Sequence, residues 1–483
     1  MAKHIEGVSR SQVSLFADRL EDYVPLDSVV RVLDAYVDRV DVRGLGFERA
    51  VPAATGRPGY APGTLLKLYL YGYLHGVRSS RRLEAESRRN AHVMWLLGKL
   101  APDFKTVATF RQENGAALVS VCAGFVTFCR AQGLLAGTEV AVDGTKMRAA
   151  ASRRRVATQK GVAKDLTATR EKMASYLAAL DEADAAEEGS PDALEEAGRV
   201  TAALAALQGK ETRLEALAGE IAASGRDSLV VGEPQARPMR GGGRSVGPAY
   251  NAQIAVSTDN HLIVHHAVTQ DTNDRHQLEP MALGAQRALG LDAAPLADDG
   301  TPSLRVLADA GYSNGEQAQA CEAAGIEPSV PPQRAVNTQG LFGRDAFTYD
   351  AADDSFICPA GQRLRRKRRS TSNKLDTYSA RDCRDCPLRP QCTQADRRTV
   401  TRSWFEDTLQ RMERRIAADP DLMRRRRCTA EHPFGTFKAG DAGRFLTRGL
   451  DKVTTEFSLS VLAYNFRRVL ALLGPPRFLA ALA

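Results

Sequence analysis

Two short apolar runs each end in an aspartate, and this pattern restricts where the two acids can lie in a fold. Residues 140–142 precede Asp143, and residues 306–308 precede Asp309. Short runs of aliphatic residues predict buried strands. A carboxylate at the end of a buried strand costs free energy unless it is paired or binds a metal ion. The two aspartates are therefore candidate metal ligands.

A third acid, Glu431, lies in an arginine-rich segment. Arg427 precedes it by four residues and Lys438 follows it by seven. On a helix these offsets place the three side chains on one stripe, although Pro433 and Gly435 weaken the prediction of a continuous helix. Two acids on strands and a third among cations suit two-metal phosphodiester chemistry.

Charge and composition agree with a nucleic-acid partner without requiring one. The formal net charge of +8 favours a polyanion, because Lys and Arg displace phosphate counterions; a modest positive charge also serves solubility. No apolar run is long enough to span a bilayer, and no apolar stretch follows a basic start. Eight cysteines in 483 residues do not indicate a secreted disulfide scaffold. We therefore expect a cytoplasmic protein with no membrane partner.

The first part of the chain, residues 20–134, is predicted to be helical. Residues 65–74 form an apolar helix opened by Pro62, which helices tolerate at their first position. A turn and a basic helix follow, in the layout of a helix-turn-helix DNA reader. An ordinary helical bundle with a solvated basic face is the alternative. The candidate DNA-contacting residues are Arg78, Arg81 and Arg82.

The strands around the two aspartates are predicted to form one mixed sheet. Residues 138–146 give the strand of Asp143, and residues 304–308 give the strand of Asp309. Two further strands, at 250–256 and 261–268, are joined by a hairpin-type turn. A helix is predicted over 275–289, and Asn314 is a candidate cap for the helix after Asp309.

An Ala-, Glu- and Leu-rich segment, residues 160–224, interrupts this sheet. Its apolar residues recur at helical spacing, and residues 189–192 break the run. The pattern favours a helical hairpin packed on its own small core over a dimerisation seam. The residues of the stripe are Leu204, Leu207, Leu214, Leu217 and Ile221.

A second insertion, residues 347–398, contains four of the eight cysteines. The two-residue spacing of Cys383 and Cys386 lets both sulfurs face one ion, and four thiolates would give a closed structural zinc site. An iron–sulfur cluster and unliganded thiols are the alternatives. The four candidate ligands are Cys358, Cys383, Cys386 and Cys392; Cys122 and Cys129 are expected in an apolar core.

Two arginine runs precede the third acid, one at 363–369 inside the cysteine-rich insertion and one at 424–427. Such runs are usually solvated faces, but their position beside a candidate metal site favours contact with phosphates. The residues expected to contact DNA are Arg365, Arg366, Lys367, Arg368 and Arg424.

The chain resembles DDE-type transposases of bacterial insertion sequences over nearly its whole length. It is most similar to the branch with a helical amino-terminal domain and a cysteine cluster before the catalytic glutamate. The matching stretches are residues 141–146, 248–253 and 308–312 and the spacing of Arg427, Glu431 and Lys438. That spacing matches the family's Tyr-Arg-Glu-Lys signature, except that Arg424 stands at the tyrosine position.

The resemblance implies a mixed α/β fold with a ribonuclease-H-like core. In this fold the strands of Asp143 and Asp309 lie side by side. The expected division of the chain is a helical DNA-binding domain at 1–135, a catalytic core at 136–158, 226–346 and 399–475, a helical hairpin at 159–225, a cysteine-rich basic insertion at 347–398 and a tail at 476–483.

The resemblance also implies an activity. Asp143, Asp309 and Glu431 would hold two Mg²⁺ ions, or Mn²⁺, with Arg427 and Lys438 steadying a phosphate or the glutamate. The enzyme would cleave DNA at the terminal inverted repeats of its element and join it to target DNA, as a homo-oligomer associated with the nucleoid. A catalytically inactive DNA-binding relative and a nuclease of the same fold are the alternatives.

Overall fold

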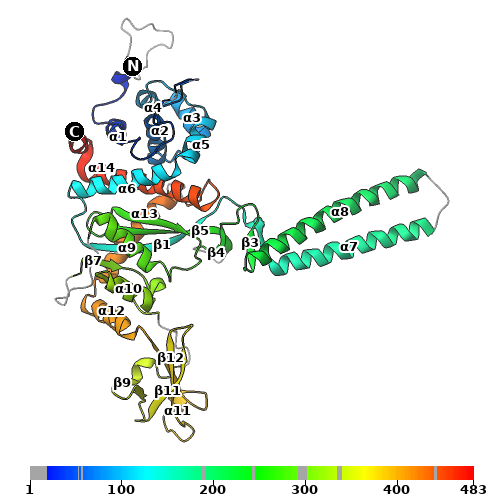
Figure 1. Ribbon diagram of the computed structural model, residues 1–483, viewed down its shortest axis with the longest axis vertical. Coiled ribbons are helices and arrows are strands. Elements are labelled where there is room, and N and C mark those ends of the chain that lie inside the picture. The colour runs from blue at the N-terminus through cyan, green and yellow to red at the C-terminus, as the bar shows by residue number, and fades with distance from the viewer. Residues whose placement is uncertain are drawn as a thin grey trace, which may run out of the picture.

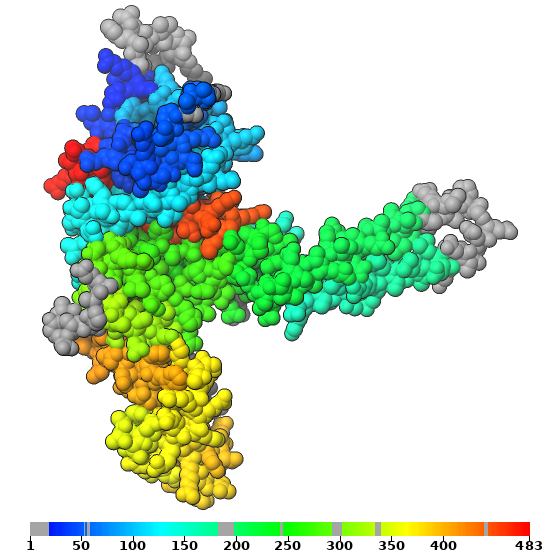
Figure 2. All heavy atoms as spheres, viewed as in Figure 1, coloured from blue at the N-terminus to red at the C-terminus, as the bar shows by residue number. Residues whose placement is uncertain are grey.

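The structure is a computed structural model that describes residues 19–483, apart from 53, 56–57, 186–190, 242–244, 292–301, 334–339 and 440–442 and the side chains of 182–197. A helical region lies at one end of the molecule, an α/β core in the middle and a small β-sheet unit at the other end (Figure 1). A long two-helix arm projects sideways from the core (Figure 2).

The central sheet has the strand order of a ribonuclease-H-like core. Its middle strand, β1 (Glu139–Arg148), pairs antiparallel with β5 (Val246–Ser257) and parallel with β7 (Leu304–Leu307). The parallel strand β8 (Ile326–Ser329) lies beyond β7. On the other side, β6 (Ile263–Thr269) and β4 (Arg237–Arg240) pair with successive parts of β5. The expected mixed α/β fold is confirmed, including the adjacency of the two aspartate-bearing strands.

Helices cover this sheet, which explains why three consecutive residues of β1, 140–142, are all buried. The sheet contacts α9 (Leu278–Leu289), α13 (Leu422–Ala439) and α14 (Leu450–Leu482). At the β8 edge lie α10 (Gly315–Ala323) and α12 (Glu406–Ala418). Asn314 caps α10 as expected, because its side chain accepts a hydrogen bond from the Glu316 amide at 3.1 Å.

The amino-terminal region is helical, as predicted, and shares its hydrophobic core with the sheet. Its elements are η1 (Leu20–Tyr23), α1 (Val29–Asp38), α2 (Pro62–Leu74), α3 (Ser80–Arg89), α4 (Ala91–Leu96), α5 (Phe104–Glu113) and α6 (Gly115–Ala131). The last helix of the chain, α14, packs against α1, α2 and α6 as well as β6. One continuous core therefore runs from Val24 to Leu482, and Cys122 and Cys129 lie in it as expected.

The end of the chain differs from the tail expected at 476–483. Those residues continue α14 beyond a kink at Gly474, whose φ of 71° is in the left-handed region that favours glycine. Phe478 is fully buried against Phe125 and Phe466. The segment is thus part of the shared core.

The Ala-rich insertion is the projecting arm, a hairpin of α7 (Gln159–Ala185) and α8 (Pro191–Ala223). Its base is closed by η2 (Arg153–Arg155) and the short pair β2 (Val156–Thr158) and β3 (Ser228–Val230). A small core of its own contains Val162, Ile221 and Leu229, as predicted. Half of the predicted break, residues 189–190, lies outside the described residues, and residues 191–192 begin α8.

The cysteine-rich insertion is a five-stranded antiparallel sheet with a separate small core. Its elements are η4 (Arg344–Ala346), β9 (Thr348–Asp350), β10 (Ser355–Ile357), β11 (Arg363–Ser370), β12 (Leu375–Ser379), α11 (Arg389–Cys392) and β13 (Thr399–Ser403). The core includes Phe356, Leu364 and Tyr378. Because β13 belongs to this sheet, the insertion extends to Ser403, beyond the expected boundary at 398.

Among the described residues, no single helix is long and apolar enough to cross a membrane; one bent pair, α5 with α6, meets that test on length and composition.

Candidate active site

The parallel pairing of β1 and β7 brings Asp143 and Asp309 to neighbouring positions. Val140 lies opposite Val306 and Ala141 opposite Leu307, so the same register places Asp309 beside Asp143. Asp309 follows the end of β7 and caps η3 (Ala310–Tyr312), because its Oδ1 accepts a hydrogen bond from the Gly311 amide at 2.8 Å. The two carboxylates therefore belong to one site.

Arg426 of α13 joins these two carboxylates. Its Nη2 lies 2.9 Å from Oδ1 of Asp143 and 3.4 Å from Oδ2 of Asp309. The arginine is buried, with 8% of its surface exposed, so the guanidinium is committed to this pair. Arg426 was not among the residues predicted for the site, although it lies within the 424–427 run. Successive residues of a helix point about 100° apart, so the run itself indicates that its arginines cannot all face solvent in the same direction.

Asp143 is poorly solvated. Burial raises the pKa of its carboxyl to about 6; Arg426 and the Gly144 amide oppose that rise, and the nearby charges of Asp309 and Asp274 add to it. A buried carboxylate with two acidic neighbours is stabilised by a cation. Arg426 supplies that cation here.

Glu431 is on the same helix but on a different face. The helix α13 continues through Pro433 and Gly435, the two residues that weakened the prediction of a continuous helix, and Arg427, Glu431 and Lys438 are all exposed. Glu431 is five residues after Arg426, which is a rotation of about 140° around the helix. Among the described residues, no three His, Cys, Asp or Glu side chains form a group that could hold a metal ion. The structure thus brings together two of the three predicted acids.

Two family models match the chain, in parts that flank the sheet described above. "Transposase domain (DUF772)" matches residues 18–113, and "Transposase DDE domain" matches residues 357–470. The chain belongs to the DDE-type insertion-sequence transposases. The second match contains Glu431, Arg426 and the cysteine-rich region, whereas Asp143 and Asp309 lie outside both matches.

A solved structure, the piggyBac transposase synaptic complex with hairpin DNA, has 8% sequence identity with this transposase. The likeness covers 91% of this chain and 79% of that chain at a TM-score of 0.25, which is too low to establish a common fold. No curated protein matches the chain.

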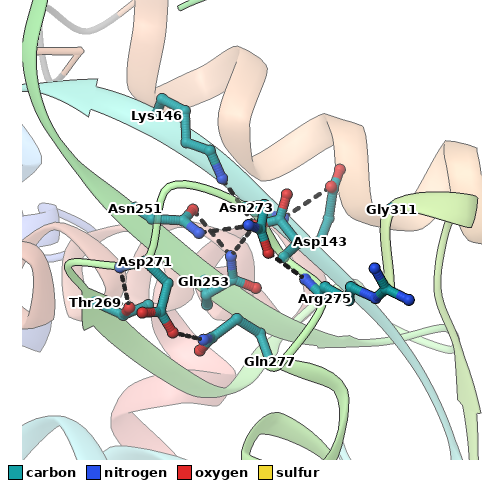
Figure 3. A network of polar contacts seen from close by, with 12 residues as sticks. Asp143, Lys146, Asn251, Gln253, Thr269, Asp271, Asn273, Arg275, Gln277 and Gly311 are labelled. Carbon is teal, nitrogen blue, oxygen red and sulfur yellow. Dashed lines mark hydrogen bonds and ion pairs between the residues drawn. The ribbon is translucent and has the colours of Figure 1, made fainter. Parts of the chain in front are cut away.

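A fourth acid of the transposase, Asp274, lies in the loop between β6 and α9. Its partners Lys146, Asn251 and Gln253 lie near Asp143 (Figure 3). Oδ1 of Asp274 accepts hydrogen bonds from Lys146 Nζ at 2.8 Å, Asn251 Nδ2 at 2.7 Å and Gln253 Nε2 at 2.7 Å. Tyr312 donates its hydroxyl proton to Oε1 of Gln253. The sequence analysis missed Asp274, because no apolar run marks its position.

Gly144 is required by this network. A Cβ atom at that position would lie 2.1 Å from Gln253 Nε2 and 2.9 Å from Asp274 Oδ1. The glycine after Asp143 therefore leaves room for the polar side chains that surround the site.

The four insertion cysteines of the transposase line one small cavity. Cys358, Cys383, Cys386 and Cys392 are among its lining residues, and backbone amides donate hydrogen bonds to two of the sulfurs, Cys358 Sγ at 3.3 Å and Cys383 Sγ at 3.5 Å. Burial and the other three thiols raise the pKa of Cys392, whereas Arg398 lowers it. Within the described part of the chain the four thiols do not form a group arranged to hold a metal ion, although the donor set is one that zinc prefers.

The predicted DNA-contacting arginines of the amino-terminal region divide into two kinds. Arg81 and Arg82 are exposed at the start of α3, and the guanidinium of Arg81 stacks 4.9 Å from the centre of the Phe104 ring. Arg78 instead is buried and lies 3.2 Å from Glu456, a fully buried residue of α14. The expectation of a DNA contact by Arg78 is corrected, since its side chain links the helical region to α14.

The run at 363–369 is not a flexible segment but the strand β11. Arg365, Arg366, Lys367 and Arg368 are all exposed on it. Arg366 pairs with Asp354 at 3.0 Å and Arg365 with Asp353 at 3.8 Å. Within the described part of the chain, Lys367 and Arg368 have no ion-pair partner. Arg424 is exposed and pairs with Asp421 at 3.1 Å.

Proposed function

We propose that this transposase binds the ends of its insertion sequence, cleaves a DNA strand there and joins that strand to target DNA. One observation carries the proposal: Asp143 and Asp309, on adjacent strands of a ribonuclease-H-like sheet, converge on a single cation. Phosphodiester cleavage in such a sheet depends on acids held at this place to bind divalent metal ions.

The donor set fits Mg²⁺, with Mn²⁺ as a substitute. Two carboxylates already share one positive group, the Arg426 guanidinium, and hard oxygen ligands suit these ions. We propose two ions per site, held by Asp143, Asp309 and Glu431. When bound, they lower the pKa of an attacking water and stabilise the leaving oxygen of an in-line displacement.

The side chains of α13 have separate tasks in this proposal. Arg426 neutralises the two aspartates, and its guanidinium would have to give way where Asp143 and Asp309 hold a metal ion. Glu431 would be the third ligand, and because it lies on another face of α13 from Arg426, this role would require a different position of the helix. Arg427 and Lys438 share the exposed stripe of Glu431 and contact the DNA phosphates, which cations position without reading sequence.

DNA recognition is assigned to a second surface, with homo-oligomers of the transposase assembled on the DNA. Arg81 and Arg82 contact the terminal repeat from α3. Arg365, Arg366, Lys367, Arg368 and Arg424 contact the backbone. A structural zinc ion in the cavity of the four cysteines would hold the β9–β13 sheet in shape.

The test uses end-labelled duplex carrying the element's terminal inverted repeat, Mg²⁺ and a target plasmid. Nicked products together with strand-transfer products support the proposal. Nicks without joined products would indicate a nuclease of the same fold, and binding without either product would indicate an inactive DNA-binding relative.

A further inference from the structure

A basic cavity lies beyond the active site, at the far end of β1. It has a volume of about 460 Å³ and is formed by β1, the β4–β5 hairpin and the segment between α13 and α14. Its charged lining residues are Lys146, Arg148, Arg153 and Arg444. Among its described lining residues there is no carboxylate, so the cavity concentrates positive charge.

The backbone brings two of these arginines together. Residues 443–445 extend the sheet beside the end of β1: the Arg148 amide donates to the Gly443 carbonyl at 3.3 Å, and the Phe445 amide donates to the Arg148 carbonyl at 2.9 Å. Arg148 and Arg444 are the paired residues of this bridge. Like charges placed on neighbouring strands repel each other, so this arrangement favours a bound anion.

No described carboxylate pairs with the guanidinium groups of Arg148, Arg153 and Arg444. Arg148 and Arg153 are exposed, and neither has an ion-pair partner within the described ranges. Arg444 donates Nη2 to the Ala150 carbonyl at 2.7 Å, which fixes the side chain but leaves its charge uncompensated. Arg153 lies over Gly247, where a Cβ would come within 3.2 Å of its Cγ.

The cavity is connected to the active site through Lys146 and Asp274. Lys146 lines the cavity and pairs with Asp274 at 2.8 Å, and the charge of Asp274 acts in turn on Asp143. Arg148 is five residues from Asp143 on the same strand, about 17 Å along an extended chain. Duplex DNA rises about 3.4 Å per nucleotide of one strand, so this span corresponds to about five nucleotides.

We propose that the cavity binds a backbone phosphate of the DNA strand that leaves the active site, about five nucleotides from the cleaved bond. Arginine forks pair with phosphate oxygens through two parallel hydrogen bonds. The inference rests on the proposed function, because it assigns the DNA path from that site. An acidic peptide is the competing ligand, and the test separates the two.

The first experiment measures binding of the full-length protein to a fluorescein-labelled terminal duplex, without divalent metal, over a range of salt concentrations. The variant Arg148→Ala/Arg153→Ala removes two exposed cations whose side chains have no ion-pair partner among the described residues. The slope of its plot of log Kd against log salt concentration should be shallower than that of wild type by about 0.9, the value for one lost phosphate contact. The matched control, Lys210→Ala/Arg213→Ala on α8, should leave the slope unchanged, and Arg148→Lys/Arg153→Lys should retain most of it.

An unchanged slope for the alanine pair, or an equal decrease for the α8 pair, would overturn the assignment. A second contrary result would be that polyglutamate inhibits DNA binding by wild type but not by the alanine pair, while the salt slope of DNA binding by the alanine pair equals that of wild type. Ethylation interference gives the position: loss of the contact should map about five nucleotides from the cleaved phosphate. Binding is measured without metal and therefore does not depend on cleavage. If the wild type never cuts DNA but the alanine pair still shows the shallower salt slope, the proposed catalysis is refuted and the phosphate site is supported.

Discussion

Arg426 on helix α13 lies 2.9 Å from Asp143 on the central strand of the sheet. The guanidinium thus occupies a position beside both aspartates that a metal ion would also require, and two cations there would repel each other. Arg426→Gln should therefore raise the affinity for Mn²⁺ in the absence of DNA by about tenfold, which corresponds to about 1.4 kcal/mol. Electron paramagnetic resonance of free Mn²⁺ measures this directly.

The control for that change is Arg424→Gln, which removes an exposed arginine of the same helix that pairs with Asp421. It should leave Mn²⁺ affinity unchanged. Equal affinities for wild type and Arg426→Gln would mean that the guanidinium does not compete with the metal.

Removal of any of the three predicted acidic ligands should abolish cleavage and joining. Asp143→Asn, Asp309→Asn and Glu431→Gln nearly keep the side-chain volume but remove a negative ligand, so activity in Mg²⁺ should fall by at least about a thousandfold, equivalent to about 4 kcal/mol. DNA binding should persist. A double variant should be little worse than a single one, because ligands of one site act as a unit.

The readout is end-labelled terminal DNA scored for nicks and strand-transfer products. Asp421→Asn, a change to an exposed carboxylate before α13, is the matched control and should remain active. Wild-type cleavage by Asp143→Asn or Asp309→Asn would show that the site lies elsewhere.

Neighbouring arginines of the helical region should have different roles, some in DNA binding and one in the stability of the fold. Arg81→Ala/Arg82→Ala should weaken binding to terminal DNA and make its salt dependence shallower by about one unit per lost contact. Arg78→Ala should instead destabilise the protein by about 3 kcal/mol, the lower end of the range for a broken buried ion pair, because Glu456 loses its cation but keeps hydrogen bonds from Leu446 and Thr447. Fluorescence anisotropy and urea denaturation distinguish the two effects. Unaltered binding in the double variant would move recognition to the β11 arginines.

The cysteine cavity should hold about one zinc ion per chain. Cys383→Ser/Cys386→Ser should release it and loosen the β9–β13 sheet, while the shared core stays folded because the insertion has a core of its own. Elemental analysis of protein prepared under reducing conditions gives the metal content. Cys122→Ser, a change to a buried thiol in α6, is the control for zinc content; finding neither zinc nor iron in wild type would refute the site.

Stability should fall in mild acid because two histidines, His265 and His266, lie partly buried on β6. Burial lowers the pKa of His265 to about 4 and of His266 to about 3, whereas in the unfolded chain both titrate near 6.5. Below about pH 6.5 the unfolded state therefore binds more protons than the folded state. The free energy of unfolding has its full value above pH 6.5 and decreases as the pH falls toward 4. The slope approaches about 1.4 kcal/mol per pH unit for each histidine.

Urea denaturation between pH 4.5 and 7 measures this slope. Asp143, whose pKa is raised to about 6, contributes a slope of the opposite sign in this range, so the comparison is made in the Asp143→Asn background. His266→Gln should remove about half of the histidine slope; the ring accepts or donates one hydrogen bond, to Ser458 at 2.7 Å. His276→Gln, at an exposed position, should change nothing. A pH-independent stability of the Asp143→Asn protein would contradict the prediction.

Local patterns predicted the parts of the fold that depend on neighbouring residues. The strands of Asp143 and Asp309, the Ala-rich hairpin and the Asn314 cap each follow from short-range periodicity or capping chemistry, and the structure has all of them. The cysteines were grouped by proximity in the sequence, and proximity in space followed because one small sheet contains them.

Features that depend on long-range packing were not predictable in this way. Arg426 and Arg427 are adjacent in an arginine run, and only the orientation of α13 against the sheet decides that the former meets Asp143. Arg78 has the sequence context of a surface residue, but Glu456, 378 residues later, buries it in an ion pair. Asp274 lies in a loop without periodicity and is placed by partners on two other strands.

The position of α14 has a consequence for how the chain is made. This helix of 33 residues is synthesised after all the helices and strands that it contacts, yet it fills the core between them. During translation, the apolar faces of α1, α2 and α6 stay exposed until α14 has left the ribosome, and β1 cannot pair until β5 and β7 have been made. Contacts so distant in sequence slow folding and prolong exposure to aggregation. A nascent chain cut short before residue 450 should therefore depend on chaperones, and no partial product should acquire the paired aspartates in a finished core.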